Sequence, residues 1–294
     1  MKRFLLTLGI VLCAASLFAQ DVSRIAIEFR GTFENNRINQ NAVNNDYCPY
    51  YVVASLKEAT GSSSMPGNTY STTIYGLSSK RMYSLNSSGE NSVRMGISCS
   101  YYRGDINKEP NIDFRYALPV KQGTTAKVCQ QNNRDHSIVF DLEVSIDTVY
   151  ACRGGIVCND DFYDSSAREF RGTATWITIY HDDGTMAEYK MLSKPLVHAG
   201  DVVKMGEPIA VCESGDSRVV SVGVYYLDKN KVHDESEIRK HSHLNPLYHV
   251  LDSGVLKLER DNSYTAEITE EMLLQDMNRS QQKRYLKKRA RDNK

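Results

Sequence analysis

A run of short apolar segments separated by tight-turn signals, between residues 176 and 212, constrains the fold more than any other feature of the chain. Residues 176–180 (WITIY) are strand-like, and Asp183-Gly184 after them is a strong hairpin signal, so residues 186–189 become the return strand. Gly200 and Gly206 permit further tight reversals before the apolar residues 208–211. Short strands with so many turns favour a compact β-barrel or sandwich over a helical fold.

Four segments in and around this run have an order and spacing that are typical of one enzyme family. They are residues 116–123 (YALPVKQG), 148–157 (TVYACRGGIV), 179–185 (IYHDDGT) and 197–212. In these segments the chain resembles the lysostaphin or LytM-type zinc endopeptidases, peptidase family M23, and in particular their Bacteroidetes-type members. The resemblance implies a LytM-like β domain of the duplicated-hybrid-motif type over residues 115–268. It also implies kinship with enzymes that cleave peptide cross-links in bacterial cell walls.

The metal site that the resemblance implies is only partly represented. The family holds zinc with a His, an Asp four residues later and the second His of a His-x-His strand, which leaves one coordination position open for a reactive water. Counted back from Val149, the Asp position falls on Phe140, with His136 four residues before it and Asp141 one residue beyond it. A slip of one residue turns a strand side chain to the opposite face, so Asp141 replaces the ligand only if the strand is bulged.

The remaining catalytic positions of the family carry other residue types. The His expected after Tyr189 becomes Lys190 or Met191, and residues 219–222, where the His-x-His strand falls, contain no His in either register. Apolar replacements remove the cost of a buried charge that has no cation beside it. We therefore expect no catalytic residue, no bound metal and no cofactor, but a vestigial groove. Its predicted residues are His136, Phe140, Asp141, Met191, Val219, Ser221 and Val222.

The other histidines have simpler interpretations. His181 resembles a structural turn position of the family. His241 and His243 form a His-x-His pair, but it follows the strand where the family places its own pair, and Asn245-Pro246 shortly after predicts a loop. The alternative hypothesis is an active zinc endopeptidase with a rearranged site, built from His136, Asp141 and a His within residues 233–249. It requires these side chains to converge on one point, because Zn–N distances are about 2 Å.

The N-terminus carries an export signal. Met1-Lys2-Arg3 precedes an apolar run over residues 4–18, so residues 1–20 are predicted to be a signal peptide. No other stretch approaches the length of a transmembrane helix. We expect an exported protein that is located in the periplasm or associated with the outer membrane.

Six cysteines remain after residue 20, and in an exported chain an even number permits a disulfide framework. Spacing alone cannot fix the connectivity. Cys48 and Cys99 fall in one region, and their pairing is our prediction. Catalytic use of a thiol is not indicated.

Residues 21–114 form a separate part of the predicted architecture. Strand-like segments at residues 25–30, 50–56, 69–75 and 98–102 are separated by runs of Asn, Ser and Gly, and no helical period occurs. The pattern predicts an N-terminal β-sandwich-like domain. Its many tyrosines either pack between strands or offer a surface for stacking against glycans.

The C-terminal part is predicted to close the β domain and then change character. Residues 255–258 and 263–266 form a predicted closing hairpin. Residues 269–294 form a basic helical tail, capped by Thr269, although the whole chain has a formal net charge of zero. The predicted partner-binding residues of the tail are Lys283, Arg284, Lys287, Lys288 and Arg289.

Such a tail can attract an acidic partner or an anionic envelope surface, whereas nucleic acid is a poor candidate for an exported protein with one aromatic residue there, Tyr285. The sequence leaves the oligomeric state open. Taken together, it predicts a mainly β envelope protein that acts as a non-catalytic binding, scaffolding or regulatory component. Its expected partner is an envelope protein or peptidoglycan.

Overall fold

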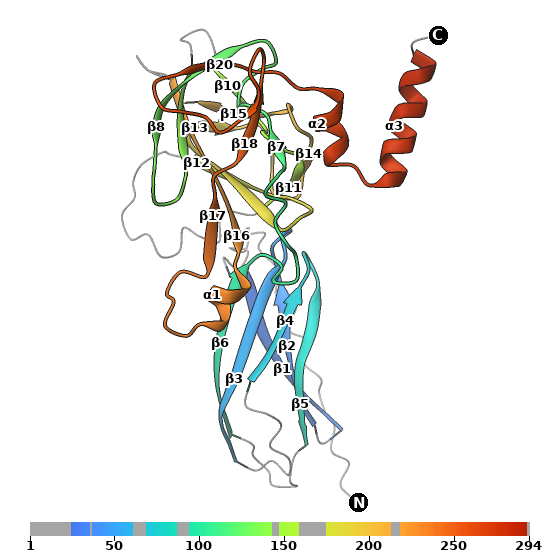
Figure 1. The fold of residues 1–294 in the computed structure, drawn as a ribbon. Coiled ribbons are helices and arrows are strands. Elements are labelled where there is room, and N and C mark those ends of the chain that lie inside the picture. The colour runs from blue at the N-terminus through green and yellow to red at the C-terminus, as the bar shows by residue number, and fades with distance from the viewer. Residues whose placement is uncertain are drawn as a thin grey trace, which may run out of the picture.

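The computed structural model describes residues 25–35, 37–60, 69–86, 94–142, 147–158, 175–212 and 218–292 of the 294-residue chain. The predicted signal peptide lies outside this part. The described residues form a mainly β protein with small N-terminal sheets, one large sheet and short C-terminal helices (Figure 1), which confirms the predicted fold class. The domain boundaries at residues 21–114, 115–268 and 269–294 stay predictions.

Two antiparallel sheets of three strands make up the N-terminal part. One has the order β1 (Ile27–Glu34), β2 (Arg37–Asn44), β5 (Ser79–Asn86), and the other β4 (Thr69–Ile74), β3 (Tyr50–Thr60), β6 (Arg94–Arg103). Alternate side chains of a strand turn to the same side, and here they meet between the sheets. Tyr50 and Val52 of β3 pack with Ile27 and Leu85 in one buried cluster. At least some of the tyrosines therefore pack in the core of this part.

The large sheet lies beyond these two sheets in Figure 1 and is built around long central strands. Its main path runs through β14 (Val202–Val203), β11 (Gly155–Val157), β12 (Thr175–Tyr180), β13 (Thr185–Pro195), β16 (Arg218–Leu227), β9 (Ile138–Leu142), β8 (Thr125–Gln131) and β20 (Ser263–Thr265). The strands β10 (Thr148–Tyr150), β15 (Pro208–Cys212) and β17 (His241–Leu244) pair at its side. A third small sheet has the order β19 (Gly254–Leu256), β18 (Leu247–Val250), β7 (Arg115–Tyr116).

Two central strands of the large sheet have one apolar and one polar face. In β16, Val220, Val222 and Val224 are buried in the main hydrophobic cluster, while the residues between them are half-buried. In β9 the buried positions are Ile138, Phe140 and Leu142. Because side chains alternate along a strand, the intervening residues share the other, outward face. That outward face carries the candidate site described below.

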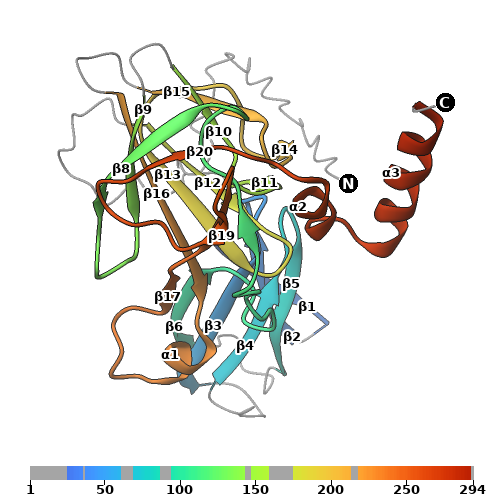
Figure 2. The ribbon, with the colours of Figure 1, turned by 45° about the horizontal axis from the view of Figure 1, so that its top comes forward.

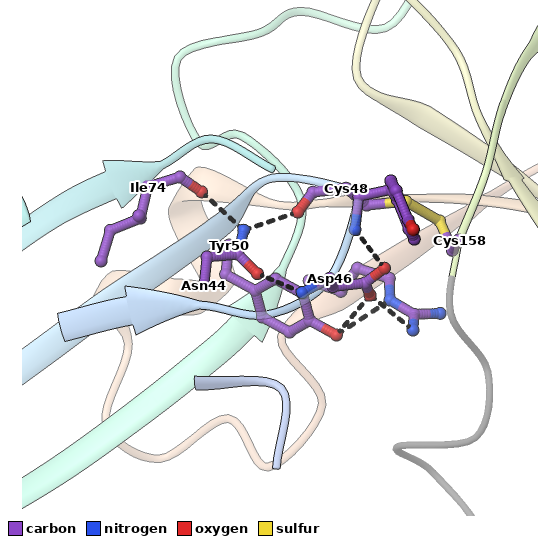
Figure 3. Close-up of a disulfide and its surroundings, with 8 residues drawn as sticks. Asn44, Asp46, Cys48, Tyr50, Ile74 and Cys158 are labelled. Carbon is purple, nitrogen blue, oxygen red and sulfur yellow. Dashed lines mark hydrogen bonds and ion pairs between the residues drawn. A yellow bond between two sulfur atoms is a disulfide. The ribbon is translucent and has the colours of Figure 1, made fainter. Parts of the chain in front are cut away.

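A disulfide and a buried ion pair lie where the N-terminal sheets meet the large sheet (Figure 3). Cys48, in the turn before β3, is bonded to Cys158, directly after β11. Close by, the buried Arg103 donates to Asp46 at 2.9 Å. The predicted pairing of Cys48 with Cys99 is wrong, because Cys99 is a free thiol in β6. The true partner is distant in sequence and is brought near by folding.

Two predictions about the C-terminal half are also wrong. The pair His241 and His243 lies in strand β17, antiparallel to β16, rather than in a loop. Residues 255–258 and 263–266 do not form a hairpin with each other, because β19 pairs with β18 and β20 pairs with β8. Local turn signals do not choose between such partners.

Three helices are present among the described residues: α1 (Lys229–His233), α2 (Glu270–Gln275) and α3 (Arg279–Asp292). Thr269 caps α2 as expected, since its hydroxyl accepts from the amide of Met272. Met272 is fully buried and anchors α2 on the main hydrophobic cluster. In the part of the chain that the structure describes, no helix has both the length and the apolar character needed to cross a membrane.

The buried guanidinium of Arg153 fixes the end of α2 to the large sheet. It donates to Asp183 at 2.8 Å and to Asp276, just after α2, at 3.1 Å, and it lies 3.6 Å from the centre of the Phe114 ring. Asp276 also accepts from the amide of Gly154 at 2.9 Å. One buried cation thus holds a β-turn and the start of the C-terminal tail together.

Candidate binding groove

The outward face of the large sheet carries a polar groove over strands β9, β13 and β16. Glu188 and Lys190 of β13 lie opposite Gly223 and Ser221 of β16, so all four residues share this face. They line a cavity of about 170 Å³. The remaining lining residues are Asp135, Ser137, Tyr225 and His243.

A second cavity of about 450 Å³ continues this one and shares Asp135, Glu188, Tyr225 and His243 with it. Its further walls come from β6, β17 and the segment between α1 and β17. They are formed by Tyr102, Ile238, Arg239, Lys240 and His241. We call the two cavities together the polar groove.

The floor of the polar groove carries an ion pair and a hydrogen-bonded carboxylate. The ammonium of Lys190 lies 2.6 Å from the carboxylate of Glu188. Asp135 accepts from both the hydroxyl and the amide of Ser137, at 2.7 and 3.0 Å. Burial works against ionisation of Asp135, but these hydrogen bonds, with His243 and Lys190 nearby, outweigh it and hold the pKa of the carboxyl below its ordinary value. The groove therefore offers the ionised carboxylate of Asp135 beside the ion pair of Lys190 and Glu188.

Both histidines of β17 take part in the groove and favour the neutral state. Burial lowers the pKa of His243, although Asp135 and Glu188 act in the opposite direction. Burial also lowers the pKa of His241, whose Nε2 donates to the carbonyl of Arg103 at 2.8 Å. The ring of Tyr225 lies 5.4 Å from that of His241 and 5.9 Å from that of His243. These contacts give the groove an aromatic wall next to its charged floor.

The structure brings few of the sequence-predicted groove residues to the groove. Ser221 lines it, but Phe140 and Val222 do not, because both are fully buried in the hydrophobic core on the opposite face of the sheet. One position of strand register separates each of them from the outward face. Asp141 and Val219 lie opposite each other and are half-buried, yet they lie outside the cavity lining.

The last two predicted residues have unusual backbones. His136 lies in the turn between β8 and β9 with φ 52°, and the exposed Met191 has φ 67°. Neither lines the groove. The residues that sequence reasoning missed are Asp135, Glu188, Tyr225 and His243. The two-residue period of the strands, counted from Ser221 and Lys190 instead of from Phe140, is the signal that finds Tyr225 and Glu188.

The side chains of the groove do not fit a zinc ion. Zinc requires three protein donors around one point. Here the Glu188 carboxylate is bonded to the Lys190 ammonium, and Nε2 of His241 is used by a backbone carbonyl. Among the described residues, no group of three His, Cys, Asp or Glu side chains is arranged to hold a metal ion. The residues that the rearranged-site hypothesis requires, which are His136, Asp141 and a His within residues 233–249, all lie within this described part.

Comparison with known proteins identifies the domain that bears the groove. Residues 137–244 match Peptidase family M23, so this part of the chain, which contains β9, β13, β16 and β17, is an M23 family domain. The general family prediction is thereby confirmed for these residues. No curated protein sequence matches the chain.

Three solved structures match the chain at low sequence identity and with low TM-scores. Pseudoalterin, an M23 metalloprotease from the deep sea, is 14% identical over 53% of this chain and 96% of its own, with a TM-score of 0.31. Csd3 of Helicobacter pylori is 13% identical over 90% and 81%, with a TM-score of 0.28. A zinc-containing peptidase of Vibrio cholerae is 12% identical over 67% and 81%, with a TM-score of 0.25.

Proposed function

We propose that this protein is an exported cell-envelope component whose M23 domain binds peptide in the polar groove without cleaving it. The observation that carries the proposal is the ion pair of Lys190 and Glu188 on the groove floor. The family resemblance expects a catalytic His at Lys190 or Met191. An ammonium instead repels a second cation and pairs with one oxygen of the nearest carboxylate. The groove keeps a shaped, charged surface in place of a metal centre.

The chemistry of the groove supports a peptide that carries both charges. Asp135 and Glu188 suit ammonium groups, Arg239 and Lys240 suit carboxylates, and Tyr225 offers an aromatic face. The cross-linking peptides of peptidoglycan display free amino and carboxyl groups at close spacing. We therefore favour peptidoglycan peptide over a protein partner as the ligand of this groove.

The disulfide between Cys48 and Cys158 is consistent with export, because disulfides persist mainly in oxidising compartments outside the cytosol. Location in the periplasm or at the outer membrane is part of this proposal. A role as scaffold or regulator follows if bound peptide recruits a partner.

Co-sedimentation with purified insoluble peptidoglycan tests the proposal. We expect the protein, expressed without residues 1–20, to sediment with it, and Asp135→Asn with Glu188→Gln to lower the affinity by about tenfold or more, because two charge-assisted hydrogen bonds are weakened. The matched control is Glu109→Gln, which removes an exposed carboxylate outside the groove. Equal affinity of the double variant and the Glu109→Gln control for peptidoglycan would show that the groove is not the binding surface.

The second candidate function is an active zinc endopeptidase with a rearranged site. One observation favours it: strand β17 brings His243 into the same cavity as Asp135, where the sequence had predicted only a loop. Incubation with peptidoglycan and added zinc decides between the two. Soluble peptides that appear with zinc and disappear with a chelator would establish the enzyme.

A further inference from the structure

Helix α3 carries a concentration of positive charge that its own fold does not balance. Seven of its residues are basic, and four i,i+4 pairs place like charges on neighbouring turns. These pairs are Arg279 with Lys283, Lys283 with Lys287, Arg284 with Lys288, and Lys287 with Arg291. Like charges at this spacing destabilise a helix. Within the described residues, α3 makes one ion pair, which joins Arg289 to Glu270 of α2.

The helix also stands away from the sheets. In Figures 1 and 2, α3 lies beside α2 and projects from the body of the protein, so most of its surface faces solvent. Its basic side chains are exposed along the whole helix. We call α2 and α3 together the helical hairpin.

An apolar cavity of about 450 Å³ lies between the helical hairpin and strand β14. Val202, Met205, Leu273, Met277 and Tyr285 form much of its wall. The charged residues that line it as well are Lys204, Arg284, Asp182 and Asp276. Val202 is 76% exposed, which is high for a large apolar residue at a strand position. An exposed apolar patch rimmed by charge is typical of an interaction site.

The chemistry of α3 selects one class of partner. A helix that lies on a membrane needs a continuous apolar face, but the large apolar residues of α3 are Tyr285 and Leu286 alone. Single-stranded nucleic acid is held by several aromatic side chains, and α3 has one. A protein segment with carboxylates can match the cations, and an apolar side chain within it can fill the cavity. Charge complementarity and the apolar cavity therefore point to the same occupant.

We propose that the helical hairpin is a docking site for an acidic segment of a partner protein, anchored by an apolar side chain in the cavity next to Val202. The carboxylates of the segment relieve the repulsion between like charges on α3. The anchor covers the apolar wall and excludes water there. This site shares no lining residue with the polar groove, so it can be occupied independently of it.

The test is fluorescence anisotropy with two labelled synthetic peptides, one of glutamate and aspartate with a central leucine, and one with serine in place of the leucine. We expect the leucine peptide to bind at low ionic strength and to weaken as salt is added. Lys283→Glu with Lys287→Glu is expected to weaken it by about tenfold or more. The control, Lys121→Glu with Lys257→Glu, makes the same charge change at exposed sites elsewhere and should change the affinity by less than about threefold.

The apolar anchor is tested separately. The serine peptide and the variant Val202→Ser should each bind about tenfold more weakly, because each change removes apolar contact between the anchor and the cavity wall. Ile112→Ser, at another exposed apolar position, should leave the affinity unchanged. Equal binding of both peptides would overturn the anchor. The proposal would be overturned if the protein does not bind the leucine peptide. It would also be overturned if the protein binds phosphatidylglycerol vesicles but not the peptide.

Discussion

Removal of the buried cation Arg153 is expected to destabilise the protein strongly. In Arg153→Met the carboxylates of Asp183 and Asp276 lose their common partner, while their side chains remain only 13% and 21% exposed. Breaking a buried ion pair by removing one partner costs about 3–5 kcal/mol. The variant also loses the cation–π contact with the Phe114 ring, but methionine keeps part of the packing against the ring, so the total cost stays in this range. We expect the free energy of unfolding to fall by about 3–5 kcal/mol.

Urea unfolding followed by circular dichroism measures the effect. With a slope of about 1–3 kcal/mol per molar urea, the midpoint should move down by about 1–3 M. Asp276→Asn keeps an acceptor for the amide of Gly154 and should cost only about 1–2 kcal/mol. Arg134→Met, at an exposed arginine, should stay within about 0.5 kcal/mol of the unchanged protein. A loss below about 1 kcal/mol in Arg153→Met would refute the assignment of Arg153 as the cation that holds α2.

The remaining predictions concern pH, the disulfide and the faces of the sheet. Burial, with the positive charge of Arg153, lowers the pKa of His181 to about 3, so the unfolded chain binds a proton at this residue more readily than the folded chain does. The stability of the protein, measured by thermal unfolding, should therefore fall as the pH drops from about 6.5 toward 3. The variant His181→Gln should show a weaker dependence of stability on pH in this range. Opening the bond between Cys48 and Cys158, which spans 110 residues, should lower stability by up to about 4–5 kcal/mol, and an unchanged melting temperature after reduction would contradict this. Phe140→Ala should cost about 3–5 kcal/mol by leaving a core cavity, whereas Asp141→Ala on the outward face should cost less than about 1 kcal/mol, and a reversed order in urea unfolding would place Phe140 in the groove after all.

Much of the fold could be predicted from the sequence because its signals are local. The hairpin at Asp183-Gly184 forms between β12 and β13 as expected, and Thr269 caps α2. Strand partners far apart in sequence could not be predicted in the same way. The return of β20 to β8, and the bond of Cys48 to Cys158, depend on the packing of the whole chain.

The site was predicted less well, for a reason that lies in strand geometry. The correspondence with the family is by sequence position, and a displacement of one residue exchanges the two faces of a strand. This exchange placed the core residues Phe140 and Val222 in the groove. His243 was missed because Asn245-Pro246 indicated a loop, while its pairing with Tyr225 makes it part of the sheet. Turn signals mark where a strand ends but not which strand lies beside it.

The zinc content of the purified protein, dialysed against zinc and then against buffer without chelator, tests the central claim most directly. The charged floor of Lys190 and Glu188 predicts far less than one zinc per chain, with peptidoglycan binding that a chelator does not alter. One tightly held zinc per chain, lost in His243→Ala but kept in the surface variant His198→Ala, would contradict the account and establish a metal centre in the groove.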